Sequence, residues 1–212
     1  MIERMKSAKS GVLSMLLTFC ILTSYAQDDV LAKNEIEAHR KKQESEMRDK
    51  EKSPLDPKDR KRFKHLNYFP IDLKYRVKAK FVRTENEPLF KMKTTTTRLP
   101  EYVKYGEVHF QLDGMDYKLN VYQSPEITKR PGYEDYLFIP FTDITNGNET
   151  YEVGRYLEFR IPTSEDVIVD FNQCYNPYCS YSPRFSCPIP PSENDLAIAI
   201  PAGEKKFKDS SH

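Results

Sequence analysis

The residues best suited to chemistry lie close together in the segment 170–194, which reads DFNQCYNPYCSYSPRFSCPIPPSEN. This segment contains Cys174, Cys179 and Cys187, spaced as C-x4-C-x7-C. Structural zinc sites use paired C-x2–4-C units and four ligands, so the spacing matches no zinc pattern, and we predict neither a metal site nor a cofactor. A disulfide is the interpretation that we favour, while free thiols, a metal site and a thiol nucleophile remain open as alternatives, although a nucleophile needs a neighbouring base.

A disulfide is the default interpretation of these cysteines if the protein is exported. We favour Cys179 with Cys187, because closing this short loop stabilises a fold by about 2–3 kcal/mol in the chain-entropy view. One thiol, that of Cys174, is then left over. His109 is the one histidine placed in a predicted strand, where histidine is more often structural than catalytic.

Carboxylates offer a second kind of chemistry. Asp170, Glu193 and Glu204 lie at strand ends or turns, where sites usually form, and they are our candidate catalytic acids. General acid–base catalysis needs two of them to converge in one pocket. The other interpretation is that such residues shape turns, as Asp commonly does.

A third candidate is Arg155, which follows Gly154. A guanidinium can form two parallel hydrogen bonds with a carboxylate or phosphate of a ligand. It can also form an internal ion pair, here with Asp143 or Asp170. Together with polar residues of the dense segment it forms the set predicted to bind a small ligand. The members of this set are Arg155, Tyr156, Asn172, Asn176 and Asn194.

Short strands must position these residues. Residues 73–81, LKYRVKAKF, alternate apolar and basic side chains, as a strand with one buried face does. Asp113-Gly114 separates two alternating runs within 107–122 and predicts a tight hairpin. Further strands are expected at 136–141, 155–161, 166–171 and 196–200. Seven to nine such strands predict a mainly β domain, an antiparallel β-barrel or β-sandwich.

The N-terminal quarter has a different character. Residues 1–26 carry basic, then apolar, then small residues, which predicts a signal peptide cleaved after Ala26. We therefore expect an exported protein, periplasmic or extracellular, with no stable membrane anchor after cleavage. Residues 27–64 predict a charged helical extension with a short helix that starts at Asp56-Pro57 and ends near Lys64. The β-rich domain follows over 65–208, and 209–212 form a tail.

The charge balance restricts the class of partner. The chain has 33 basic and 32 acidic residues. A near-neutral balance gives no electrostatic reason to expect a nucleic acid or an anionic membrane. The partner predicted from the sequence is a small-molecule ligand.

Several long motifs resemble one family. They are SPLDPKDRKRFKHLNYFP, LFIPFTDITNGNETYEVGRYLEF, the dense segment itself and AIPAGEKKF, in that order. The chain resembles the bacterial and archaeal family called domain of unknown function sixteen-eighty-four over about residues 35 to 208. Such sequences usually carry a small residue at the position of Cys174, which supports pairing of Cys179 with Cys187. Many members look cytoplasmic, which weakens the disulfide and keeps metal or thiol chemistry open.

The family name implies no activity, so function rests on the residues. Our first hypothesis is an exported small-ligand-binding module. The alternatives are a hydrolase-like enzyme that uses Asp170, Glu193 or Glu204 with Arg155, and a purely structural exported domain.

Overall fold

The computed structural model describes residues 27–207. The chain divides into two compact units, Met1–Ala38 and His39–His212. In the first unit the described residues, 27–38, are helical, and in the second unit residues 39–48 are helical. No helix in the described range is long and apolar enough to cross a membrane. The predicted signal peptide, 1–26, and the tail, 209–212, lie outside this range.

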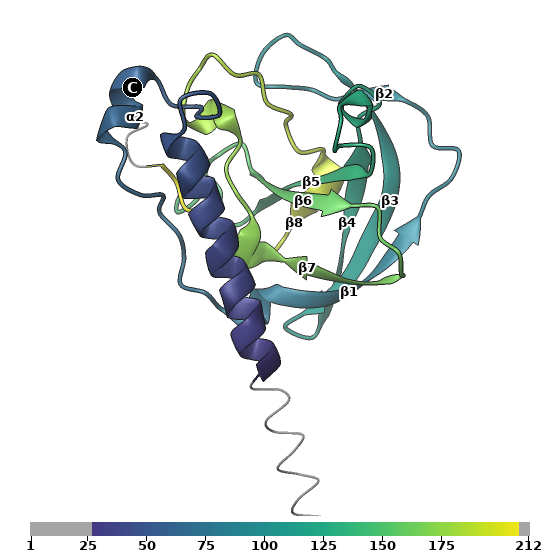
Figure 1. Cartoon of the computed structure of the whole chain (residues 1–212). Helices are drawn as coiled ribbons and strands as arrows, with labels where there is room; N and C mark the ends of the chain where they lie inside the picture. The colour runs from purple at the N-terminus through teal and green to yellow at the C-terminus, as the bar shows by residue number, and fades with distance from the viewer. Residues whose placement is uncertain (1–26, 208–212) are drawn as a thin grey trace, which may run out of the picture. The chain divides into compact units, whose positions relative to one another are not determined.

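The second unit is built on one curled antiparallel sheet that forms a half-barrel (Figure 1). Its main path runs β6-β5-β4-β3-β1-β7, with β2 added to β3 and β8 added to β5. The mainly β prediction is therefore confirmed. The strands are β1 Arg76–Arg83, β2 Phe90–Lys91, β3 Glu101–Leu112, β4 Met115–Gln123, β5 Tyr136–Asp143, β6 Arg155–Arg160, β7 Asp166–Asp170 and β8 Asp195–Leu196.

The predicted hairpin joins β3 to β4. Asp113 and Gly114 both have positive φ, 53° and 74°, as the two central residues of a tight hairpin turn require. The register pairs Leu112 with Met115 and Phe110 with Tyr117. Local turn chemistry thus sets the longest strand pair of the sheet.

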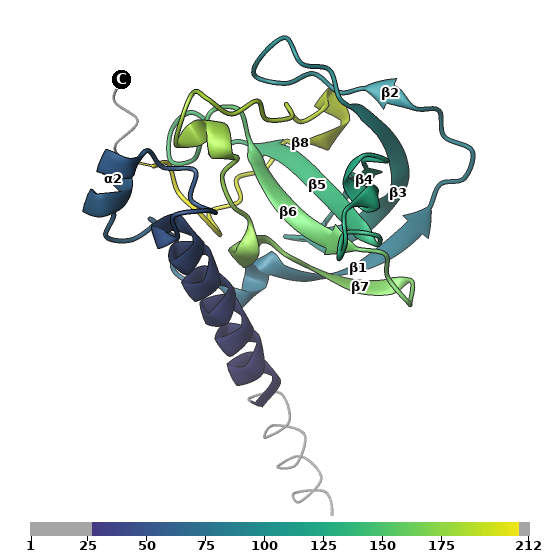
Figure 2. The same ribbon diagram turned by 45° about the horizontal axis from the view of Figure 1, so that its top comes forward.

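The core lies inside the curl and follows the sequence pattern. Val77, Ala79 and Phe81 of β1 are buried, whereas the lysines between them are exposed. In β5 seven of eight residues are buried, which agrees with a continuous apolar run covered on both faces. Figure 2 shows β5 between β6 and β4, with the loop segments lying over the open side of the sheet.

Two strand predictions need correction. The strand predicted from Leu73 begins at Arg76, because the Asp72 carboxylate accepts a hydrogen bond from the Lys74 N–H and closes a 3-10 turn, η1 Leu73–Tyr75. Residues 196–200 do not form a full strand, and β8 pairs parallel to β5 rather than antiparallel. The Ile200 N–H donates to the Asp143 carboxylate at 2.7 Å, so a side chain replaces the strand ladder there.

The short helix after Asp56 is present as α2 Pro57–Arg62. It ends before Lys64 because Phe63 is already extended, with ψ 125°. Asp56 precedes the helix but makes no capping hydrogen bond. Its carboxylate pairs instead with Arg184 of the dense segment, at 2.9 Å.

Candidate functional site

The dense segment leaves β7 and lies along β6, an edge strand of the sheet. It contains the 3-10 turns η3 Phe171–Gln173, η4 Tyr178–Ser180 and η5 Ser192–Asn194. Tyr175 and Tyr156 exchange two backbone hydrogen bonds, of 2.9 and 3.0 Å, so the segment pairs with β6 at this point. The edge strand and the segment thereby form two adjoining walls.

Between these walls and the helical residues 39–48 lies a cavity of about 300 Å³, which we call the tyrosine pocket. Its volume is at the lower end of the range for small-molecule sites. Eight of its lining residues are aromatic: Tyr102, Tyr136, Phe138, Tyr156, Tyr175, Tyr178, Tyr181 and Phe185. Edge-to-face contacts of Tyr156 with Phe138 (4.7 Å between ring centroids) and with Tyr175 (5.9 Å) order part of this lining.

Glu204 is one of the acidic residues that line the pocket, and it is almost completely buried. Its Oε2 accepts a hydrogen bond from the Asn176 N–H at 2.9 Å, and its Oε1 accepts one from the Tyr181 hydroxyl. Burial raises the pKa of Glu204 to about 7, although these hydrogen bonds oppose the shift. Glu204 can therefore change its protonation state near neutral pH.

Two buried polar atoms of the lining residues lack a partner. Asn176 Oδ1 and His39 Nε2 have no hydrogen bond to any part of the chain that the structure describes. The pKa of His39 is lowered, mainly by burial, while a hydrogen bond to the Gln173 backbone acts in the opposite direction. A backbone bond that raises a histidine pKa is one in which the ring donates, so the other nitrogen, Nε2, is an acceptor in the neutral ring.

Cys187 lines the pocket, and Cys179 lies beside it, both as free thiols. The Cys179 N–H is 3.1 Å from the Cys187 Sγ, and the Tyr151 hydroxyl is 3.6 Å from the Cys179 Sγ. Hydrogen bonds from Cys187 and Tyr151 lower the pKa of Cys179 to about 7. The same contact raises the pKa of Cys187, because losing its proton would bring two negative sulfurs together.

Cys174 is separate from this pair. It is fully buried, and burial raises its pKa to about 11. Its sulfur faces Gly203, where an added Cβ would lie 2.3 Å from it. The pairing of Cys179 with Cys187 is thus the one that the geometry favours, while its oxidation stays a prediction.

Arg155 is completely buried and does not line the pocket. Its guanidinium lies 3.0 Å from the Asp143 carboxylate and donates to the backbone oxygens of Ile200 and Ala202. This is the internal Arg–Asp pair that the sequence left open as the alternative to ligand binding. The pair ties the start of β6 and the end of β5 to residues 200–202.

Two of the predicted ligand-binding asparagines are also used inside the fold. Asn172 exchanges hydrogen bonds with the Asp72 backbone, at 2.9 and 3.0 Å. Asn194 bridges the backbones of Asn120 in β4 and Pro140 in β5, where the two strands pair at one position only. Of the predicted ligand-binding set, Tyr156 and Asn176 line the pocket.

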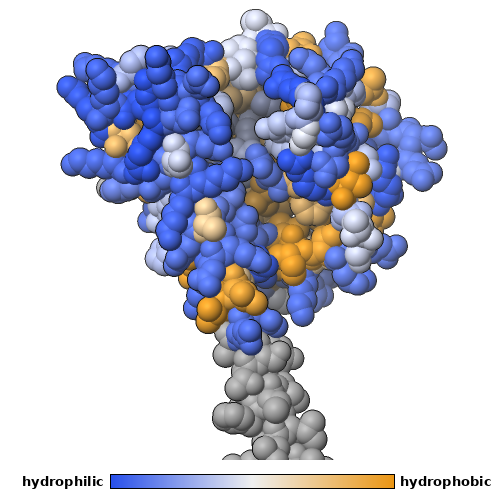
Figure 3. Space-filling view, in the orientation of Figure 1, coloured by the Kyte–Doolittle hydropathy of each residue, from blue (hydrophilic) through white to orange (hydrophobic). Residues whose placement is uncertain are grey.

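The three candidate catalytic acids have different surroundings. Glu204 lines the tyrosine pocket, whereas Glu193 is exposed. Asp170 lines a second cavity, of about 200 Å³, beside β6 and β7, and pairs with Arg76 at 2.9 Å. Figure 3 shows hydrophobic side chains gathered over this region. Neither of these two cavities is lined by more than one of the three acids, so the arrangement required for a pair of catalytic carboxylates is not formed by them.

Sequence reasoning missed most of the lining. Tyr102, Tyr136 and Phe138 belong to regular strands, and Glu46 belongs to the charged helical extension. The available signal was composition: the chain has 14 tyrosines and no tryptophan. Tyrosine combines an apolar ring with a polar tip, so such a surplus is typical of binding surfaces.

Comparison with known proteins places the chain in a family. A family model described as protein of unknown function (DUF1684) matches residues 61–205. The chain belongs to this family. The resemblance seen in the motifs is therefore confirmed, and the DUF1684 match contains the sheet, the dense segment and Glu204.

A solved structure supports the same assignment. The DUF1684 chain is similar to the solution NMR structure of the uncharacterized protein from gene locus rrnAC0354 of Haloarcula marismortui, with 32% identity and a TM-score of 0.67. The match covers 88% of this chain and 99% of that one. No curated protein matches the chain.

Proposed function

We propose that this DUF1684 protein is an exported small-ligand-binding module whose site is the tyrosine pocket. The observation that carries the proposal is the combination of a cavity of about 300 Å³, eight aromatic lining residues and unpaired buried acceptors on Asn176 and His39. Pockets that bind small molecules have this character: mostly apolar walls with a few placed polar groups. Export rests on the basic, apolar and small residues of 1–26.

The alternatives have weaker support. A hydrolase-like enzyme needs converging acids, and Asp170, Glu193 and Glu204 have separate surroundings. A purely structural domain agrees with the internal bonds of Arg155 and Asn194. It does not explain why aromatic side chains and unpaired acceptors surround one cavity.

The proposal is tested by filling the pocket. Ile127 lines the pocket and is partly exposed, so Ile127→Trp should occupy part of the cavity without disturbing the core. Ile161→Trp, at a 38% exposed residue that does not line the pocket, is the matched control. A chemically diverse set of small molecules is screened against the mature protein by thermal shift and ligand-observed NMR.

We expect hits whose affinity falls at least about tenfold in Ile127→Trp and is unchanged in Ile161→Trp, because the large ring displaces the ligand. Hits that bind both variants equally would place the site elsewhere. A screen without any hit would leave the structural alternative as the better account.

A further inference from the structure

Carboxylates without basic partners lie at the tyrosine pocket. Glu46 of the helical residues and Glu158 of β6 both line it. Neither forms a salt bridge with a described lysine, arginine or histidine. After burial, the charges of both contribute to the raised pKa of another lining residue, Tyr178, so each carboxylate lies within electrostatic range of that residue. The lining contains one lysine, Lys42, and three glutamates, Glu46, Glu158 and Glu204.

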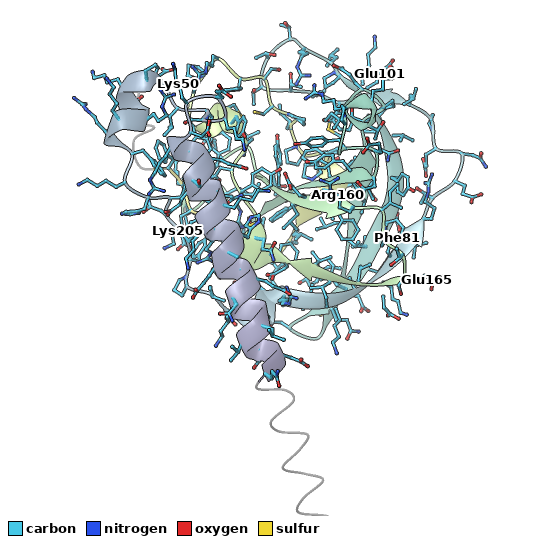
Figure 4. The ribbon with its side chains drawn as sticks, viewed as in Figure 1. Lys50, Phe81, Glu101, Arg160, Glu165 and Lys205 are labelled. Carbon is cyan, nitrogen blue, oxygen red and sulfur yellow. The ribbon has the colours of Figure 1, made fainter. Side chains whose placement is uncertain are left out.

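The aromatic lining favours the same kind of ligand as these carboxylates. A cation over the face of a tyrosine or phenylalanine ring is attracted by the negative face of the ring, and more strongly where water is excluded. The molecule already uses this contact, for example with Arg160 over the ring of Tyr133 and over that of the lining residue Tyr136. Figure 4 labels Arg160 at the end of β6. Of the eight aromatic lining residues, Tyr136 and Phe185 have a cation over the ring, from Arg160 and Arg184, whereas no described lysine or arginine lies over the other six rings.

The unpaired polar atoms are acceptors. Asn176 Oδ1 is an acceptor, and Asn176 is only 1% exposed. The Asn176 amide nitrogen already donates to the Lys205 oxygen at 2.9 Å, which fixes the orientation of the amide. His39 Nε2 is an acceptor in the neutral ring. A buried acceptor without a donor is unfavourable. A ligand that donates N–H groups to these two atoms would remove that cost and bind more tightly.

We propose that the tyrosine pocket is selective for an organic ammonium: a protonated primary or secondary amine on an apolar body. This inference rests on the proposed function. The apolar body packs against the aromatic rings, and the charge interacts with the carboxylates of Glu46 and Glu158. The N–H groups of the amine donate to acceptors such as Asn176 Oδ1. A quaternary ammonium would satisfy the rings and the carboxylates but would leave the acceptors unpaired.

The test uses four probes of similar shape: 2-phenylethylamine, 2-phenylethanol, (2-phenylethyl)trimethylammonium and 3-phenylpropanoate. Each is titrated into the mature protein at pH 7 and followed by ligand-observed NMR. The amine is expected to bind at least about tenfold more tightly than the alcohol, since it adds a charge–carboxylate and a cation–π contact. The trimethylated probe should bind more weakly than the amine, and the propanoate should not bind.

Variants locate the effect. Glu46→Gln and Glu158→Gln should each weaken binding of the amine by about three- to tenfold and leave the alcohol unchanged, because they remove a charge and keep the shape. Glu85→Gln, at an exposed residue away from the pocket, is the matched control and should change neither.

The outcomes separate this inference from the proposed function. If the alcohol or the propanoate binds as tightly as the amine and Ile127→Trp abolishes that binding, the pocket is a binding site but the ammonium class is wrong. If no probe binds at millimolar concentration while the diverse screen finds pocket ligands, the inference also fails alone. If neither finds a ligand, the two proposals fail together.

Discussion

The guanidinium of Arg155 lies 3.0 Å from the carboxylate of Asp143, and both side chains are completely shielded from solvent. Asp143 also accepts hydrogen bonds from Thr145 and from the Ile200 N–H. The two charges are thus paired with each other and hydrogen-bonded to Thr145 and to the backbone of residues 200–202. An ion pair of this kind holds the segments that carry it together, and removing one member leaves an uncompensated buried charge.

Arg155→Met is therefore expected to lower the free energy of unfolding by about 3–5 kcal/mol, since Asp143 stays buried without its partner. Urea unfolding followed by circular dichroism measures the change. The control is Arg160→Met, which breaks the exposed pair with Asp135 and should cost no more than about 1 kcal/mol. Equal decreases in the free energy of unfolding of the two variants would show that the buried Arg155 pair contributes no more to stability than the exposed Arg160 pair.

The stability should depend on pH through Glu204. Burial raises the pKa of its carboxyl to about 7 from the usual 4.5, so the folded protein holds a proton that the unfolded chain has already released. The stabilisation is fully present below about pH 4.5 and is lost as the pH rises through about 7, with a size of up to about 3 kcal/mol. Urea midpoints between pH 4.5 and 8 measure it.

The Glu204→Gln variant provides the control, because an amide does not titrate in this range. Its stability should change less between pH 4.5 and 8 than that of the parent protein. A parent and a variant with the same pH profile would assign the titration to another group.

Cys179 and Cys187 are expected to form a disulfide when treated with oxidised dithiothreitol, which accepts the two protons and two electrons that the thiols lose. Their closeness, with the Cys179 N–H 3.1 Å from the Cys187 Sγ, makes the bridge reachable with little backbone movement. Mass spectrometry after alkylation should find one free thiol among the three cysteines that the structure describes, that of buried Cys174.

Single substitutions identify the pair. Cys174→Ala should still form the bridge, and Cys187→Ala should not. Three alkylated cysteines in the oxidised parent protein would contradict the prediction and favour free thiols.

Gly203→Ala should be strongly destabilising. The residue has φ +72°, and an added Cβ would lie 2.3 Å from the Cys174 sulfur and 2.6 Å from the Cys174 backbone oxygen. Strain and overlap together should cost at least about 2 kcal/mol. Gly132→Ala shares the positive φ, +82°, but meets no atom within 4 Å, so it isolates the cost of φ, which is about 1 kcal/mol. Similar losses in both would rule out the overlap with Cys174.

The sequence predicted those parts of the fold that local rules control. Alternation located β1, β3 and β4, and Asp113-Gly114 located their hairpin, because period-two burial and turn chemistry act over a few residues. Residues 196–200 were misread, because the Ile200 N–H is bound by the distant Asp143 carboxylate rather than by a strand. The alternation of apolar and polar residues along a segment gives no information about a hydrogen-bond partner that is distant in the sequence.

The candidate site was predicted less well, for a related reason. Asn172 and Asn194 looked like ligand-binding residues because polar residues in a dense loop often are. In the fold they replace backbone hydrogen bonds between distant segments. The residues that line the pocket come from β3, β5, β6, the helical residues 39–48 and the dense segment. These segments are distant in the sequence and meet only in the tertiary structure.

The position of the Arg155 acceptors also has a consequence for the order of events during synthesis. β1 pairs with β7, whose residues are made about 90 positions later, and Arg155 obtains two of its acceptors only from residues 200 and 202. At about 5–20 residues per second, most of the sheet leaves the ribosome well before these partners exist. The nascent chain therefore cannot complete the β1–β7 pairing before β7 is made, nor the hydrogen bonds of Arg155 before residue 202 is made.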